Sequence, residues 1–244
     1  MPTSLDPTPP LPEVDGWFAC AMRGLLPPRC LLCGAEGRGA CDLCAACELA
    51  LPRNDACCAR CALPLARSVA LCGACLRQAP LWDEARVPLR YADPLDTLVL
   101  RLKFGGDLAA GRLLSQCMAA ALGGAELPDA IVPVPLSRRR LAQRGYNQAL
   151  ELARLVARGL RVPLAPGCLR RARDTAPQAE LDAAARRANL RGAFVAPAPS
   201  ALRGLHLALF DDVVTTGATA GECARVLRAA GATRVSLWAI ARAP

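Results

Sequence analysis

The pattern of apolar and polar positions near the C-terminus predicts a strand, a loop and a helix. Residues 207–210 form an apolar run that Asp211 and Asp212 follow directly, which is typical of a buried strand ending at two acids. A Thr/Gly turn comes next, over residues 215–219. The apolar positions after it recur every three or four residues, and Gly231 stands where such a helix would end. We therefore expect an α/β domain in this part of the chain.

A second strand-to-helix unit lies upstream. Residues 130–135 are typical of a strand that ends in prolines, and an amphipathic helix follows. The buried face of that helix is marked by Leu152, Leu155, Val156 and Leu160. Between strand and helix lies a basic segment, residues 137–148, which we interpret as a loop. In a parallel sheet this loop would lie at the carboxyl edge, where α/β folds bind ligands, although a solvated basic loop is the alternative.

Two further segments allow two interpretations each. Residues 81–107 link the halves of the chain and end in Lys103, Phe104 and a Gly-Gly pair, which fits either a loop that faces a ligand or a helix C-terminus. Residues 169–194 are rich in arginine and precede the Asp-Asp strand. They are placed to form a mobile hood over a ligand, or they contain a surface helix.

The turn after the two acids has the features of a phosphate site. A loop that opens onto a helix N-terminus offers free N–H groups and the positive end of the helix dipole, and this one adds three threonine hydroxyls. The two carboxylates could accept hydrogen bonds from vicinal sugar hydroxyls, directly or through Mg²⁺. The alternatives are acids without a chemical role and a phosphate site of another kind.

This motif resembles the phosphoribosyl-pyrophosphate (PRPP) binding motif of the type I phosphoribosyltransferases. The likeness covers the apolar strand, Asp-Asp, two apolar residues and Thr-Thr-Gly-x-Thr. It implies that Asp211 and Asp212 hold the ribose hydroxyls. It also implies a 5-phosphate site formed by Thr215, Thr216, Gly217, Ala218 and Thr219.

The charge of the chain favours anionic partners. The 244 residues carry a formal net charge of +9, and residues 90–244 alone hold 22 basic and 12 acidic residues. All but one of these basic residues are arginine, whose planar guanidinium binds phosphate with two hydrogen bonds. Solvated surface charges are the alternative for any single arginine.

The cysteines define a separate N-terminal module. Eleven of the 14 cysteines precede residue 80, and eight of them form four C-x2-C pairs, each separated from the next by 10 residues. Two such pairs complete a tetrahedral zinc site, so we expect two structural zinc ions. Pairing in chain order gives Cys30, Cys33, Cys44 and Cys47 for the first and Cys58, Cys61, Cys72 and Cys75 for the second.

Other interpretations of the cysteines remain open. Interleaved pairing would satisfy the same spacing, and a [4Fe–4S] cluster or a disulfide framework are rival uses of the thiols. We treat Cys41 and Cys57 as spare thiols. A closed four-thiolate shell leaves no open position for water, so we expect no catalysis at the metal.

Taken together, the motifs resemble the ComF family. The likeness rests on the four C-x2-C pairs, residues 102–107, Val-Pro-Val-Pro at 132–135, Arg-Gly-Tyr-Asn-Gln at 144–148, Pro177-Gln178, residues 187–190 and the Asp-Asp motif. It implies a type I phosphoribosyltransferase-like parallel sheet with flanking helices, preceded by a double zinc ribbon. We expect an N-terminal extension over 1–27, the ribbon over 28–80 and the phosphoribosyltransferase-like domain over 81–244.

The resemblance also implies a function. ComF-like proteins assist the handling or inward transport of single-stranded DNA in natural transformation, so we expect PRPP with Mg²⁺, single-stranded DNA and DNA-uptake proteins as partners. The cations that we expect to contact phosphate, pyrophosphate or DNA are Lys103, Arg138, Arg139, Arg140, Arg144 and Arg187. The chain shows no membrane span and no export signal, and we expect a cytoplasmic protein.

Two other functions compete with this one. The first is an active phosphoribosyltransferase in nucleotide synthesis or salvage, for which the sequence shows no acceptor site. His206, the single histidine, precedes the predicted strand and is better placed for a structural role than for that of a general base. The second is a scaffold whose zinc ribbons dock DNA-uptake partners.

Overall fold

A parallel β-sheet forms the centre of the computed structural model, which describes residues 28–38, 41–173 and 189–244. Its main strands are β3 (Ala130–Pro133), β6 (His206–Val214) and β7 (Arg234–Arg242), and the order is β1-β7-β6-β3. Two short strands, β1 (Glu84–Arg86) and β2 (Leu89–Arg90), pair with successive parts of β7. Every pairing in this sheet is parallel, so the carboxyl ends of β3 and β6 lie at the same edge.

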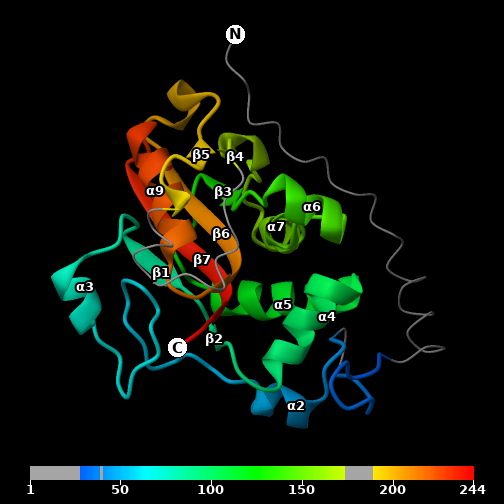
Figure 1. Cartoon of the computed structure of the whole chain (residues 1–244). Coiled ribbons are helices and arrows are strands. Elements are labelled where there is room, and N and C mark those ends of the chain that lie inside the picture. Colours follow the sequence, from blue (N-terminus) through cyan, green and yellow to red (C-terminus); the bar gives the residue numbers. More distant parts are fainter. Residues whose placement is uncertain (1–27, 39–40, 174–188) are drawn as a thin grey trace.

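Helices cover both faces of the sheet (Figure 1). One face packs against α4 (Leu95–Gly105), α5 (Leu108–Ala121) and α7 (Gln148–Leu160), whereas α9 (Ala218–Ala229) covers the other. Alternation along the strands divides the core accordingly: Leu207 and Leu209 of β6 face the α9 side, and Ala208 and Phe210 face the α5 side. The predicted parallel α/β sheet with flanking helices, preceded by a cysteine-rich module, is confirmed.

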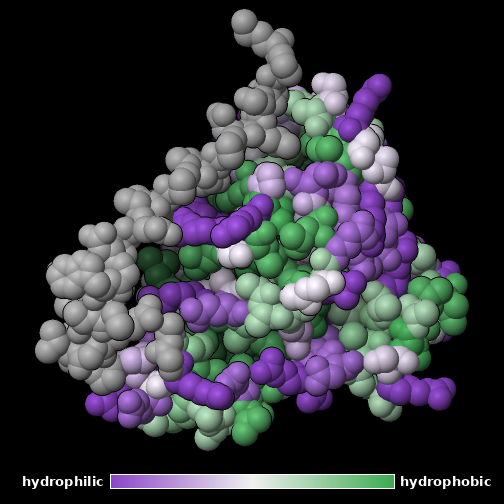
Figure 2. Space-filling view, turned by 180° about the vertical axis from the view of Figure 1, so that it is seen from behind, coloured by the Kyte–Doolittle hydropathy of each residue, from purple (hydrophilic) through white to green (hydrophobic). Residues whose placement is uncertain are grey.

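The remaining elements are short. On the α9 side, β4 (Arg170–Arg171) and β5 (Phe194–Val195) form an antiparallel pair, and the 3-10 helices η1 (Pro166–Cys168) and η3 (Pro199–Leu202) pack on the same part of the core. The cysteine-rich part contributes α2 (Ala45–Ala50) and α3 (Gly73–Arg77). Across the described ranges, none of the helices has the length and apolar character needed to cross a membrane. Polar and apolar side chains are interspersed on the face that Figure 2 shows.

The basic segment after β3 is not the loop that its composition predicts, but contains the helix α6 (Arg138–Arg144). Ser137 caps its N-terminus by accepting a hydrogen bond from Arg140 N, and Gly145 ends it in the left-handed conformation with a φ of 78°. The capping serine and the terminal glycine can both be read in the sequence. The arginines between them show no apolar periodicity, so the segment does not look like a helix. The arginines nevertheless project from a short helix.

The strand β6, which precedes the Thr/Gly turn at residues 215–219, is longer than the apolar run suggests. The prediction that it ends at the two acids was wrong, since β6 continues through Asp211 and Asp212 to Val214. Its neighbour β7 has nine residues as well, and the ladder pairs Asp211 with Ala239 and Val214 with Arg242. The two acids thus lie on a strand in which Asp211 and Val213, on either side of Asp212, are paired with β7, which fixes the direction of the backbone there. In α7 the predicted buried face is correct except that Leu155 and Leu160 are half-buried.

Candidate functional site

A cavity of about 310 Å³ opens at the carboxyl ends of β3 and β6. Its wall holds the two acids of β6, one threonine of the following loop, one threonine in the first turn of α9 and cations from three other elements. The polar lining residues are Lys103, Arg140, Arg144, Asn147, Gln148, Arg171, Asp211, Asp212, Thr215 and Thr219. Four cations face two carboxyl groups here, so the cavity suits a ligand that carries several negative charges.

The two acids have different surroundings. Asp212 Oδ2 lies 2.9 Å from Lys103 Nζ, and both side chains are mostly buried. Asp211 Oδ1 accepts a hydrogen bond from Asp212 N at 2.9 Å. Burial and the neighbouring Asp212 carboxylate raise the pKa of Asp211 to about 8. The Asp211 carboxyl group therefore retains its proton near neutral pH.

The loop from Val214 to Gly217 leads directly into α9. Gly217 is the N-cap residue of this helix, with a φ of 73°, and no side chain caps the helix end. Thr215 and Thr219 line the cavity, whereas Thr216 Oγ1 accepts a long hydrogen bond of 3.4 Å from Ala218 N. The exposed helix N-terminus beside the cavity is the arrangement that binds phosphate groups. Of the predicted loop residues, Thr216, Gly217 and Ala218 form the turn without lining the cavity.

Arg144 is held in the cavity wall by two contacts. Its Nη1 donates a hydrogen bond of 3.0 Å to Gln148 Oε1, and its guanidinium lies 5.1 Å from the centre of the Phe104 ring. Gln148 is almost fully buried, and its Nε2 has no hydrogen-bond partner among the residues that the structure describes. A buried amide donor without a partner at a cavity wall is suited to an acceptor on a bound ligand.

The other predicted cations are divided. Lys103, Arg140 and Arg144 line the cavity, whereas Arg138 and Arg139 are exposed on α6 and do not. Arg187 lies outside the described residues, as do residues 174–188 of the predicted hood.

The sequence argument did not single out Arg171, Asn147 and Gln148 as cavity residues. Asn147 caps α7 by accepting a hydrogen bond from Ala149 N, and it donates to Val134 O at 3.0 Å, so a capping residue at the end of the basic segment was a usable signal. Arg171 reaches the wall from the β4–β5 pair, which no local pattern predicted.

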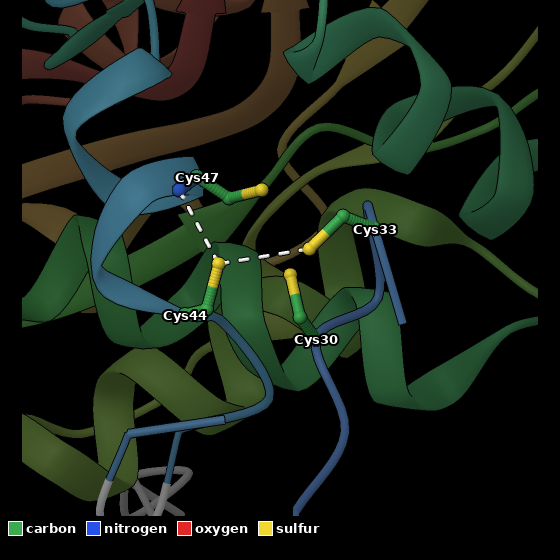
Figure 3. A group of neighbouring side chains, drawn as sticks. All are labelled: Cys30, Cys33, Cys44 and Cys47. Atoms are coloured by element: carbon green, nitrogen blue, oxygen red, sulfur yellow. Dashed lines mark hydrogen bonds between the residues drawn. The ribbon is translucent and has the colours of Figure 1, made fainter. Parts of the chain in front are cut away.

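Two groups of four cysteines are assembled as pairing in chain order predicts. In each group the four Sγ atoms lie within 4.8 Å of one another, and Cys41 and Cys57 belong to neither. Figure 3 shows the Sγ atoms of Cys30, Cys33, Cys44 and Cys47 converging, with Cys33 Sγ 3.6 Å from Cys44 Sγ. Tetrahedral Zn–S bonds of about 2.3 Å place sulfur atoms about 3.8 Å apart, so each group fits a structural zinc ion.

In each group one thiol has a lowered pKa, whereas neighbouring thiols and burial raise the pKa of others, such as Cys47 and Cys61. Burial alone would raise the pKa of the Cys30 thiol. Hydrogen bonds from the backbone N–H groups of Cys44, Cys33 and Leu32 outweigh this effect and lower the pKa to about 6. In the second group the N–H of Cys75 and neighbouring thiols similarly lower the pKa of Cys72 to about 7. Each group thus contains a thiol that ionises readily, and the thiolate is the form that binds metal. We call the two groups the first and the second cysteine site.

His206 is remote from the cavity. It is the first residue of β6, at the amino end of the strand, whereas the two acids lie towards its carboxyl end. Its Nε2 lies 2.7 Å from Ser236 Oγ, and its N–H donates to Asp129 Oδ2 at 2.8 Å. These contacts hold neighbouring strands and loops together, which agrees with the expected structural role.

Comparison with known proteins gives relatives over most of the chain. A model described as the double zinc ribbon domain matches residues 21–76. Competence protein F of Haemophilus influenzae is 37% identical over 69% of this chain and 76% of its own length. The DNA utilization protein YhgH of Escherichia coli O157:H7 is 35% identical over 89% of this chain and 98% of its own length.

A solved structure of glutamine PRPP amidotransferase from B. subtilis overlaps 53% of this chain and 24% of its own, with a TM-score of 0.34 and 22% identity. The relatives competence protein F and YhgH match this chain over most of its length at 35–37% identity. The chain therefore belongs to the ComF family, which the order of its motifs resembled.

Proposed function

We propose that this protein binds PRPP or a related phosphoribosyl ligand with Mg²⁺ and assists the handling or import of single-stranded DNA in natural transformation, as a cytoplasmic protein. The names of the relatives, competence protein F and DNA utilization protein, support the DNA role. The single observation that supports the ligand is the placement of Asp211 and Asp212 beside the α9 N-terminus, in the wall of one cavity that four cations also line.

Each part of a phosphoribosyl ligand has a matching part of the cavity. The acids suit the ribose hydroxyls, directly or through Mg²⁺, and Thr215 and Thr219 at the helix N-terminus suit the 5-phosphate. Arg140 and Arg144 in the cavity wall suit the pyrophosphate, which arginine binds with paired hydrogen bonds. A cavity of about 310 Å³ is at the lower end of the range for small-molecule sites, so it fits one such ligand.

The DNA role is supported by the arginines outside the cavity. Arg138 and Arg139 are exposed on α6, within one turn of Arg140, and so extend the positive charge of the cavity onto the surface. With 4% aromatic residues in the chain, contacts to DNA are expected to be mainly to phosphate rather than by base stacking. Such binding weakens steeply as salt rises.

Titration calorimetry of PRPP with Mg²⁺, with and without single-stranded DNA, tests the ligand. We expect saturable binding by the full chain and its loss in Asp212→Asn, because the amide cannot replace the charged carboxylate. Asp129→Asn is the matched control, since Asp129 lies just before β3, beside the amino end of β6 and away from the cavity, where it accepts a hydrogen bond from the His206 backbone N–H. Absence of heat with the unaltered protein would refute the ligand.

The pKa of Asp211 gives a second test at the same site. Since its pKa is raised to about 8, most Asp211 carboxyls hold a proton at pH 7.5, and Mg²⁺ or sugar binding would displace it. Calorimetry in buffers of different ionisation enthalpy should show proton release at pH 7.5 and none at pH 9.5. Affinity for the magnesium complex should rise over the same interval. Equal proton release at both pH values would contradict the assignment of Asp211.

The DNA role is tested by filter binding of single-stranded DNA over a range of salt concentrations. We expect a linear fall of log affinity with log salt. The double variant Arg138→Gln, Arg139→Gln should have a shallower slope, by about 0.7 for each phosphate that it no longer neutralises. PRPP affinity of this variant should be unchanged, since neither side chain lines the cavity. A slope equal to that of the unaltered protein would exclude α6 from the DNA interface.

A further inference from the structure

We call residues 214–217, the loop that leads into α9, the phosphate loop. The second cysteine site is connected to this loop through the carbonyl groups of its first knuckle, residues 58–62. Four consecutive carbonyls of this knuckle each accept a hydrogen bond from elsewhere in the chain. The pairs are Ala85 N to Ala59 O at 3.0 Å, Trp82 Nε1 to Arg60 O at 2.6 Å, Arg242 Nε to Cys61 O at 3.2 Å and Asn54 Nδ2 to Ala62 O at 2.9 Å. The knuckle therefore has a fixed position against β1 and β7.

Trp82 forms the first of two bridges from the knuckle to the loop. Its indole N–H binds Arg60 O, and the residue is 4% exposed. The far edge of the ring packs on Gly217 so closely that a Cβ at this position would lie 2.9 Å from Trp82 Cη2. The ring therefore sets how far the turn at the start of α9 can move towards the knuckle.

Arg242, the last residue of β7, forms the second bridge. One side of its guanidinium donates from Nε to Cys61 O. Its Nη1 donates to Val214 O at 3.1 Å, and also to Thr215 O and Ala243 O. The residue is 8% exposed, so water cannot easily replace these bonds. The buried guanidinium of Arg242 thus binds the carbonyl of Cys61 in the knuckle and the carbonyl of Thr215 in the loop.

We propose that the second cysteine site, with its metal bound, sets the conformation of the phosphate loop, and that Trp82 and Arg242 are the positioning residues that transmit it. A metal held by Cys58 and Cys61 fixes the knuckle whose Arg60 and Cys61 carbonyls receive the two bridges. Loss of the metal frees those carbonyls, and the loop loses its support on the side away from the ligand. The effect on ligand affinity rests on the proposed function, whereas the effect on the loop does not.

The first cysteine site provides the matched control. It packs on α4 and α5, where Arg101 Nη1 donates to Leu31 O at 2.5 Å and Arg112 pairs with Asp42. Cys33 and Cys61 hold the same place in the two motifs, as the second cysteine of the first pair. Cys33→Ser and Cys61→Ser are thus the same chemical change in two different surroundings.

The experiment measures three quantities on the full chain: zinc content, amide hydrogen exchange of residues 213–220 and PRPP affinity with Mg²⁺. We expect both serine variants to fall from two zinc ions to one. Only Cys61→Ser should speed exchange in 213–220 and weaken PRPP binding, each by roughly tenfold, as for the loss of buried hydrogen bonds. Cys33→Ser should leave both within roughly twofold of the unaltered protein. Equal effects of the two variants, or none, would overturn the proposal.

Two variants that retain all eight cysteines cover the case in which Cys61→Ser does not fold. Trp82→Phe removes the indole N–H, and Arg242→Lys removes the fork while keeping the charge. Faster exchange at 213–220 with two zinc ions still bound supports the proposal, and unchanged exchange in both overturns it. If the unaltered protein binds no PRPP, the proposed ligand fails, but the exchange measurements still decide whether the site and the loop are coupled.

Discussion

The two cysteine sites have the same ligands and the same spacing, yet they differ in what surrounds them. In the first site only Cys30 is buried, against the core next to α4 and α5, whereas Cys33 is exposed and Cys44 and Cys47 are half-buried. Its hydrogen bonds to these helices come from long side chains that reach the surface. In the second site three of the four cysteines are buried. The spacing thus predicts a metal ion in both sites, but the buried contacts of the knuckle determine what that metal supports.

The largest effect that separates the two sites is expected from removal of a metal ligand. Cys75→Ser should lower the free energy of unfolding by several kcal/mol, because structural zinc contributes on the order of 10–16 kcal/mol in finger peptides and the second site is part of the interior. Cys47→Ser, its counterpart in the first site, should cost less because its surroundings already meet solvent. Chemical denaturation checks both, and an equal or larger loss for Cys47→Ser would refute the distinction.

A second comparison concerns the side chains that anchor each site. Asn54 is 5% exposed and donates to Ala62 O and to Val87 O, at 2.9 and 3.1 Å. Asn54→Ala leaves two buried carbonyls without a donor, and we expect a loss of about 2–4 kcal/mol. Arg101→Ala in the first site should cost about 1 kcal/mol or less, since water can reach Leu31 O. The measurement is urea unfolding of both variants beside the unaltered protein. Equal losses of unfolding free energy in Asn54→Ala and Arg101→Ala would contradict the comparison.

Gly217 and Gly221 both lie against the Trp82 ring and give a third test. Alanine should lower the stability of the protein at the first position and raise it at the second. Gly217→Ala places a methyl group against the ring in a left-handed backbone, and we expect a loss of about 1–3 kcal/mol together with weaker PRPP binding. Gly221→Ala meets the same ring at 3.8 Å, an ordinary contact, inside α9. It should stabilise the protein by about 0.5–1 kcal/mol. Thermal unfolding with PRPP titration measures both, and stabilisation by Gly217→Ala would show that the ring does not confine the loop.

The smallest effect is expected at the surface of the first site. Arg112 pairs with Asp42, but the arginine side chain is 56% exposed. We expect Arg112→Ala to cost about 0.2–1 kcal/mol, with less effect at high salt. PRPP affinity should not change. A loss of several kcal/mol would show that the first site is anchored as firmly as the second.

The sequence predicts those features that depend on local chemistry. Knuckle spacing identified both sets of four cysteines, because each C-x2-C pair is a local turn that presents two thiols. The strand, loop and helix around Asp211 were predictable because burial and turn residues follow one another in order. The position of Lys103 beside Asp212 was predictable only in outline, as a single lysine before a glycine pair.

Contacts between distant segments lay beyond the sequence argument. Trp82 is 135 residues from Gly217 along the chain, and Arg242 is 181 residues from Cys61. Neither residue belongs to a recognisable motif, since one follows the ribbon and the other ends the last strand. Arg171 reached the cavity through the β4–β5 pair for the same reason. The helix α6 was missed although Ser137 and Gly145 mark its ends, because its exposed arginines show no buried face.

The knuckle of the second site meets its neighbours through main-chain carbonyl groups. A carbonyl oxygen is present whatever side chain the residue carries, so Ala59 or Ala62 could be exchanged during evolution without removing the acceptor. The donors have no such freedom, because an indole and a guanidinium make the two bridges from this knuckle to the loop. If this connection is under selection, Trp82 and Arg242 should therefore be conserved among related proteins, whereas the residues between Cys58 and Cys61 should vary.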